Sequence, residues 1–144
     1  MPVELFLLKM DKFSLQFPLE GDLVRLIPLK ADDFDALFQV ASDALIWEQH
    51  PNKNRYQKEV FSTFFEGAMA SKGAFIVLEK SNDQVIGSTR FYDYDPIQKS
   101  VFIGYTFIAR KYWGKSINKA IKHMMLDHAF AYCDQVLFHI GEHN

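Results

Sequence analysis

The chain has few of the features that mark secreted or membrane proteins. Its single cysteine, Cys133, excludes a disulfide within the chain. No apolar run approaches the ~20 residues that a membrane-spanning helix needs. The short apolar run Leu5–Leu8 is not preceded by the basic segment of a secretion signal. We therefore expect a cytoplasmic protein without a membrane partner, in which Cys133 packs in the core.

The chain also has little excess of charge of either sign. The 16 basic and 18 acidic residues leave a net charge of −2, which argues against a nucleic-acid partner bound by bulk electrostatics. The five histidines lack cysteine partners and a His-Glu-x-x-His pattern, so we expect no metal site.

Hydrophobic residues, by contrast, are plentiful. They make up 49% of the 144 residues, and 14 are phenylalanines, as expected for one packed domain. No repeat or linker divides the chain. We assign residues 1–20 to an N-terminal extension and residues 21–144 to the domain.

Hydrophobic periodicity predicts a mixed α/β fold. Apolar residues at helical spacing predict three helices. The first is capped by Asp32 or Asp33 and ends near residue 41; the others run from about Gln57 to residue 71 and from about Lys115 to residue 132. Apolar runs between turn signals predict strands at 23–27, 74–78, 84–92, 99–108 and 136–140. The three middle strands form an antiparallel meander, and the helix 115–132 connects 99–108 to a parallel strand. Gly87 inside a strand indicates a bulge or a close backbone approach.

The most informative stretch runs from Ile103 to Asn118. An apolar strand enters a cationic turn at Gly114, and the turn opens an amphipathic helix. Backbone N–H groups at a helix N-terminus can hold an anion such as a pyrophosphate. Gly114 permits close approach of the ligand, while Lys111 and Lys115 add positive charge. A basic surface loop without a ligand has the same layout, so the pattern alone leaves both readings open.

The amino-acid sequence of this turn is more specific than its layout. Its six residues read Lys111-Tyr-Trp-Gly-Lys-Ser116. They resemble motif A, Gln/Arg-x-x-Gly-x-Gly/Ala, of the GNAT superfamily of acyl-CoA-dependent N-acetyltransferases. The resemblance is best to the branch of ribosomal-protein N-terminal acetyltransferases (the Rim type). Here Lys replaces Gln/Arg, and Ser replaces the last small residue. The resemblance covers about residues 20–144 and implies a GNAT-like α/β fold with a mixed sheet.

The resemblance also implies acetyl-CoA as the co-substrate, with no metal. The pantetheine arm would bind to unpaired backbone groups of Phe107, Ile108 and Ala109. The turn would hold the pyrophosphate, and the cofactor-binding candidates there are Lys111, Trp113, Gly114, Lys115, Ser116, Ile117 and Asn118. Asn144 resembles the first residue of a later family motif, Asn-x-x-Ser, and is a further candidate.

No motif identifies the general base. Many relatives have a glutamate where this chain has Phe102. Glu142 and His139, beside the last predicted strand, are the catalytic candidates, although a solvated strand end would look the same. Glu48 with His50, or the cluster Tyr92–Asp95, could border a groove for the acceptor amine.

We expect an N-acetyltransferase that acetylates a primary amine, either a protein N-terminus or a small amine. The family fold continues with a helix and a strand beyond the position of Asn144, so the resemblance implies a fold shortened at its C-terminus. The alternative function is therefore a catalytically weak or inactive CoA-binding remnant that acts as a binding or assembly module. A nucleotide- or phosphate-binding domain is a third possibility. We also expect the exposed edge of the strand 136–140 to favour a homo-oligomer.

Overall fold

The computed structural model describes residues 13–139, in which six strands form one sheet with the strands in sequence order. The strands are β1 (Leu19–Glu20), β2 (Val24–Pro28), β3 (Ala74–Glu79), β4 (Val85–Asp95), β5 (Ser100–Ile108) and β6 (Gln135–Leu137). The helices are α2 (Phe34–Ala41), α3 (Lys58–Ser71) and α4 (Ile117–Phe130). Three 3-10 turns, η1 (Ala31–Asp33), η2 (Ala44–Trp47) and η3 (Arg110–Tyr112), join them.

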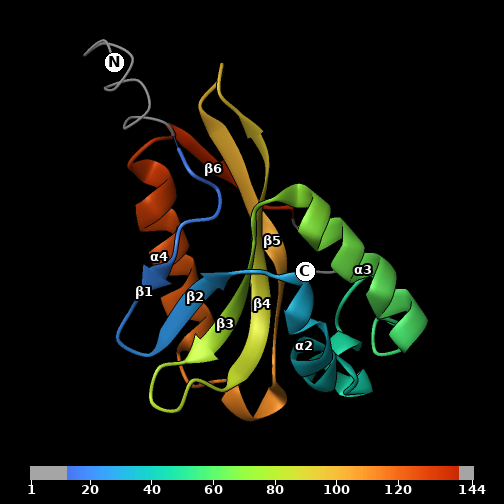
Figure 1. Ribbon diagram of the computed structural model, residues 1–144. Helices are drawn as coiled ribbons and strands as arrows, with labels where there is room; N and C mark the ends of the chain where they lie inside the picture. Colours follow the sequence, from blue (N-terminus) through green and yellow to red (C-terminus); the bar gives the residue numbers. More distant parts are fainter. Residues whose placement is uncertain (1–12, 140–144) are drawn as a thin grey trace.

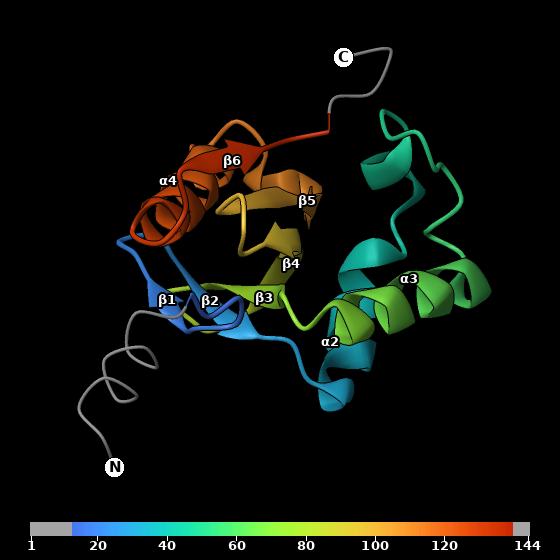
Figure 2. The same cartoon turned by 90° about the horizontal axis from the view of Figure 1, so that it is seen from above.

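The sheet is mixed. Strands β1 to β5 pair antiparallel with their neighbours, and β6 pairs parallel with β5. Helix α4 covers one face, and α2 and α3 lie on the other (Figures 1 and 2). The predicted mixed α/β class, the meander and the parallel crossover are thus confirmed.

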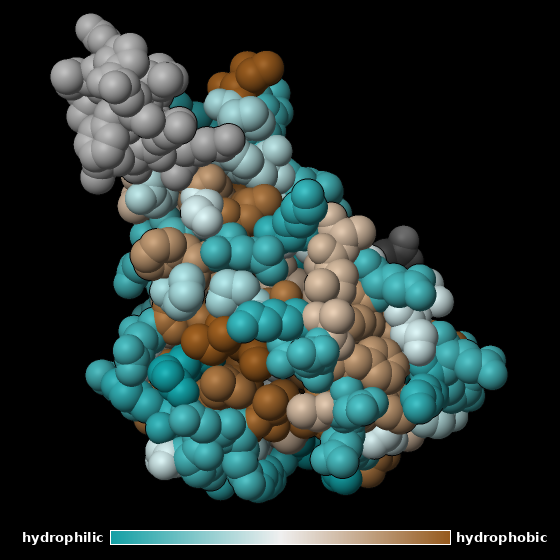
Figure 3. Space-filling model, viewed as in Figure 1, coloured by the Kyte–Doolittle hydropathy of each residue, from teal (hydrophilic) through white to brown (hydrophobic). Residues whose placement is uncertain are grey.

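Each face of the sheet has its own apolar core. The core under α4 includes the helix stripe Ile117, Ile121, Met125 and Ala129, together with Cys133, which is 4% exposed as expected. The core under α3 includes Phe61, Phe64, Phe65 and Ala68. The face seen in Figure 1 is largely hydrophilic, with apolar residues showing over β2–β4 (Figure 3). Among residues 13–139, no helix combines the length and apolar character that a membrane span requires.

Residues 13–20, which we assigned to an N-terminal extension, lie against the domain. Phe13 is 5% exposed and packs in the core under α4. The side-chain amide of Gln16 donates to the carbonyl of Ala74 at 2.8 Å, and β1 adds an edge strand to β2.

A bulge in β5 changes which residues face each core. The register with β4 slips between Ser88 and Arg90, and Tyr105 has a φ of +55°. Before the bulge, Ile103 packs in the core under α4; after it, Phe107 packs in the core under α3. Odd-numbered residues therefore change faces at Tyr105, since an extra residue reverses the alternation of a strand.

The expected close approach at Gly87 is confirmed. A Cβ atom there would lie 2.1 Å from the carbonyl oxygen of Phe107 on β5. Only glycine allows the two strands this spacing.

Three local features differ from the prediction. Two of them, the strand β1 and the turn η2, were not expected. Asp33 precedes α2 but does not cap it, because its carboxylate accepts the backbone N–H of Lys30 at 2.8 Å. The other predicted helices and strands lie within about two residues of their predicted starts.

Candidate active site

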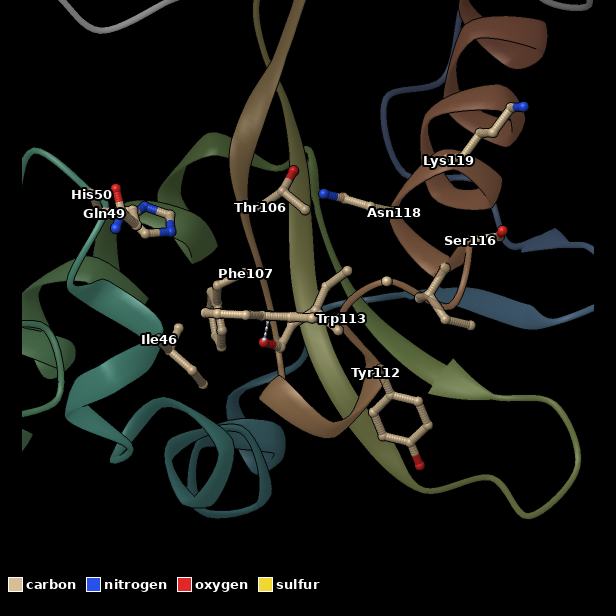
Figure 4. A pocket seen from close by; sticks show the side chains of 13 residues that line it. Ile46, Gln49, His50, Thr106, Phe107, Tyr112, Trp113, Ser116, Asn118 and Lys119 are labelled. Carbon is tan, nitrogen blue, oxygen red and sulfur yellow. Dashed lines mark hydrogen bonds between the residues drawn. The ribbon is translucent and has the colours of Figure 1, made fainter. Parts of the chain in front are cut away.

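A cleft of about 510 Å³ opens beside the C-terminal half of β5. Its floor is Thr106, Phe107 and Ile108. In Figure 4 the segment from η2 to His50 forms one wall, and the turn before α4 forms the other. The cleft is thus built from three segments that the fold brings together around one strand.

The floor presents an open strand edge. β6 pairs with β5 only at Ser100, Val101 and Phe102. From Ile103 to Ile108, no strand among residues 13–139 pairs with β5 on its β6 side. An extended ligand can bind such an edge as an added strand does, through main-chain hydrogen bonds. Within the described residues, the parallel pairing of β5 with β6 therefore ends at Phe102.

The turn before α4 is suited to an anion. Gly114 and Ser116 have φ angles of +75° and +65°. The Ser116 side chain does not cap the helix, and the first turn of α4 contains no acidic residue. The first N–H groups of a helix have no partner within it and carry the positive end of the helix dipole. They face a cleft that Ile117 and Asn118 line.

Trp113 ties the turn to the strand. Its indole N–H donates to the carbonyl oxygen of Ile108 at 2.9 Å (Figure 4). The ring is 49% exposed and lines the cleft. This hydrogen bond fixes the turn relative to the end of β5.

Asp43 stabilises the start of the opposite wall, the segment from η2 to His50, through a hydrogen bond and an ion pair. Asp43 precedes η2 and accepts the backbone N–H of Leu45 at 3.1 Å. Its carboxylate also pairs with Arg110 in η3. The hydrogen bond from Arg110 holds the pKa of Asp43 below its usual value. This ion pair joins the start of η2 to η3, and both residues line a hollow next to the cleft.

His50 is the titratable side chain of this wall. It is half-buried, and its ring packs edge-on against Trp47 at 5.0 Å between ring centres. Burial and then the nearby charge of Arg55 lower the pKa of His50. The imidazole is therefore neutral at pH 7 and can accept a proton.

The structure brings seven of the predicted cofactor-binding residues to the cleft. They are Phe107, Ile108, Trp113, Gly114, Ser116, Ile117 and Asn118. Lys111 instead lines a neighbouring hollow, with its ammonium 5.1 Å from the centre of the Tyr112 ring, and Lys115 lines neither.

Ala109 does not offer the unpaired backbone groups that we expected. Its N–H donates to Ile86 at 2.8 Å, and its carbonyl accepts from Tyr112 at 3.0 Å. Phe107 also directs its carbonyl toward Gly87 on β4. Ile108 is thus the one of the three whose carbonyl lies on the Trp113 side.

The catalytic candidates lie elsewhere. His139 is exposed and does not line the cleft; its Nδ1 lies 3.1 Å from the hydroxyl of Tyr92. Glu142 and Asn144 lie outside the described residues. Of the pair proposed to border an acceptor groove, His50 lines the cleft, whereas Glu48 does not.

Sequence reasoning missed several lining residues: Ile46, Gln49, Thr106, Tyr112 and Lys119. The last three adjoin predicted residues and could have been found from strand and helix geometry. Nothing local to the η2 segment indicates that it reaches the cleft. No group of three potential metal ligands occurs within residues 13–139.

Comparison with known families decides the fold family. The model of the acetyltransferase (GNAT) domain matches residues 24–144. This chain belongs to the GNAT acetyltransferase family. No curated protein sequence matches it significantly.

Solved structures share the fold of this GNAT domain. A GCN5-related N-acetyltransferase from Brucella melitensis has 21% identity and a TM-score of 0.68, over 80% of this chain and 55% of that protein. A GNAT-family acetyltransferase from Bacillus anthracis has 17% identity and a TM-score of 0.71, over 89% and 76%. Mycobacterium smegmatis RimJ in complex with CoA-disulfide has 22% identity and a TM-score of 0.59, over 79% and 60%. The chain thus spans less than two thirds of the length of several structures that it matches.

Proposed function

We propose that this GNAT domain transfers an acetyl group from acetyl-CoA to a primary amine. The observation that carries the proposal is the meeting, in one cleft, of an open strand edge and an uncapped helix N-terminus. The two features suit the two chemical parts of CoA: an extended amide-bearing arm and a pyrophosphate. The CoA-disulfide complex of the M. smegmatis RimJ neighbour supports the same ligand class.

In this proposal the pyrophosphate lies on the turn at Gly114, Ser116 and Asn118. Lys111 and Lys115 lie outside the cleft lining and contribute charge from its border. The pantetheine arm follows β5 beside Ile108 toward Thr106. The thioester then points to the space between Thr106 and His50, where the amine would attack.

Attack requires a neutral amine, and His50 is the described group best placed to remove its proton. It lines the cleft and is neutral at pH 7, so it can act directly or through one water. Glu142 stays a second candidate base. His139, turned to Tyr92 and away from the cleft, has weaker support.

The acceptor is a protein N-terminus or a small amine. The match of the turn to Rim-type sequences favours the former, and the RimJ neighbour is in keeping with it. We propose that the protein acts in the cytoplasm, where acetyl-CoA and a reduced Cys133 both occur.

We also propose that the chain self-associates through the outer edge of β6. This strand ends the sheet within the described residues, and its last residue, Leu137, and the following Phe138 are 38% and 41% exposed. An unpaired, partly apolar edge favours pairing with a second copy. Sedimentation at micromolar concentration should detect a dimer or larger species; a stable monomer would contradict this.

The activity is tested by measuring the release of CoA thiol from acetyl-CoA with small amines and with short peptides that have free N-termini. We expect acceptor-dependent release, with the acetylated amine as the product. Binding of acetyl-CoA without transfer to any acceptor would favour the alternative, an inactive CoA-binding module. Absence of both binding and transfer would contradict the proposal and leave a phosphate- or nucleotide-binding domain as the rival.

A further inference from the structure

Arg90, in the middle of β4, is an unusual buried charge. The residue is only 6% exposed, and its Nε and Nη2 atoms are buried without a hydrogen-bond partner. Burial lowers its pKa, but a guanidinium stays protonated at neutral pH. A buried donor without an acceptor is costly and rare in native proteins, so it calls for an explanation.

A second arginine shares the same aromatic surroundings. The guanidinium carbon of Arg90 lies 3.8 Å from the ring centre of Tyr105 and 5.3 Å from that of Phe64. That of Arg55 lies 4.7 Å from Phe64 and 5.9 Å from Tyr105. Arg55 also lies 5.6 Å from the ring centre of Trp47. The rings offset part of the cost of burial through cation–π attraction.

Among residues 13–139, no acidic side chain forms an ion pair with either arginine. The three ion pairs of the described residues involve other cations: Arg25, Lys80 and Arg110. Arg55 instead disfavours the charged form of Arg90, and it also lowers the pKa of His50. Two partly desolvated cations, without a counter-ion in the described part of the chain, raise the free energy of the unliganded state, and a bound anion would lower it.

This two-arginine cluster, Arg55 and Arg90 around Phe64 and Tyr105, adjoins the cleft. Tyr105 immediately precedes Thr106 in the cleft floor. Trp47, beneath Arg55, packs against both His50 and Phe107, with ring centres 5.0 Å and 4.9 Å away. In the proposed placement of acetyl-CoA, the cluster would lie past the thioester on the His50 side, where Arg55 and Phe64 line a hollow next to the cleft.

We infer that the two arginines bind a carboxylate carried by the acceptor, so that the substrate is an amine with a nearby acidic group. The inference rests on the proposed function for the identity of the amine. A carboxylate suits this site because its two oxygens match the paired N–H donors of a guanidinium. The Tyr105 and Phe64 rings can pack against the apolar part of the substrate.

The test uses product analogues, so that it does not depend on turnover or on acetyl-CoA. N-acetylphenylalanine is compared with N-phenethylacetamide, which lacks only the carboxylate, by calorimetry with the full chain. A second pair, acetyl-Ala-Asp-amide and acetyl-Ala-Asn-amide, places the carboxylate as an acidic peptide would. We expect the acidic member of one pair to bind at least tenfold more tightly than its neutral partner. A preference in the first pair identifies a free amino acid as the substrate, and a preference in the second pair identifies an acidic peptide.

Two variants locate the site. Arg90→Met and Arg55→Met keep an unbranched apolar side chain but remove the guanidinium and its charge, and each should abolish most of the preference. Arg25→Met is the matched control, because Arg25 forms an ion pair with Asp83 and lies on β2, which β3 and β4 separate from β5. If Arg90→Met fails to fold, judged by circular dichroism, the more exposed Arg55 decides the result.

Equal affinities within both pairs, or a preference kept in every folded arginine variant, would overturn the inference. Neither result would bear on acetyl-CoA binding. Conversely, a protein that discriminates between the analogues but ignores acetyl-CoA would contradict the proposed function and leave the anion subsite standing.

Discussion

The indole N–H of Trp113 donates to the carbonyl oxygen of Ile108, 2.9 Å away, and so joins the turn before α4 to the last residue of β5. The bond holds together the two features on which the proposed ligand site depends. Trp113→Phe keeps an aromatic ring but removes the donor. We expect acetyl-CoA affinity to fall about 3–10-fold, the equivalent of one lost hydrogen bond.

Calorimetry with acetyl-CoA measures this change. Phe130→Leu, which alters an exposed aromatic residue at the far end of α4, serves as the control. An affinity for Trp113→Phe equal to that of the wild type would show that the bond does not organise the site.

The pH dependence of transfer tests His50 as the base. Burial and Arg55 lower its pKa below the ordinary value of about 6.5. Activity should therefore be flat at neutral pH and fall only as the pH drops through the lowered pKa, when the imidazole becomes charged. His50→Gln should lower kcat and remove this acid limb. A pH–rate profile that the substitution leaves unchanged would exclude His50.

The shifted pKa of His50 also predicts how stability varies with pH. The folded state disfavours the charged imidazole, so stability is full above the ordinary pKa and declines as the pH falls below it. Denaturant unfolding at pH 7 and pH 5 should show a smaller decline for His50→Gln than for the wild type.

Glu142 remains the alternative base, and the comparison with His50 is direct. If Glu142 removes the proton, Glu142→Gln lowers kcat while acetyl-CoA affinity is kept. Parallel kinetics of the two variants separate the candidates. An active Glu142→Gln protein with an unaltered pH–rate profile would exclude Glu142 as the general base.

Gly87 and Gly67 form a matched pair for stability. A Cβ atom at Gly87 would collide with the backbone oxygen of Phe107, whereas one at Gly67 meets nothing within 4 Å. Gly87→Ala should destabilise by about 1–3 kcal/mol or more through overpacking. Gly67→Ala, in an exposed helical position, should stabilise by about 0.5–1 kcal/mol. Urea unfolding measures both; a neutral Gly87→Ala would contradict the close approach of β4 and β5.

Much of the fold follows from local pattern. Alternating or continuous apolar runs located β3, β4 and β5, and the stripe from Ile117 to Ala129 located α4. The bulge at Tyr105 could not be predicted in this way. Its positive φ occurs in a tyrosine rather than a glycine, and it results from pairing with β4, which local sequence does not encode.

The candidate site likewise has one part that could be predicted from local sequence and another that could not. The turn around Gly114 was found because its residues are contiguous and their spacing carries the chemistry. The opposite wall was only partly found, through His50, because its place depends on η2 and on the ion pair of Asp43 with Arg110, 67 residues apart in sequence. The unpartnered Arg90 looks like any strand arginine until its burial is known.

The most direct test of the central claim, that the cleft at Gly114 binds acetyl-CoA, is calorimetry with the wild type, Gly114→Glu and Gly67→Glu. Glutamate at residue 114 puts bulk and negative charge where the pyrophosphate would lie; at residue 67 it adds the same charge on an exposed part of α3. The account predicts that acetyl-CoA binds the wild type and Gly67→Glu alike, and that Gly114→Glu, still folded by circular dichroism, binds at least tenfold more weakly, about 1.4 kcal/mol. Equal affinity in all three proteins, or no binding by the wild type, would contradict it.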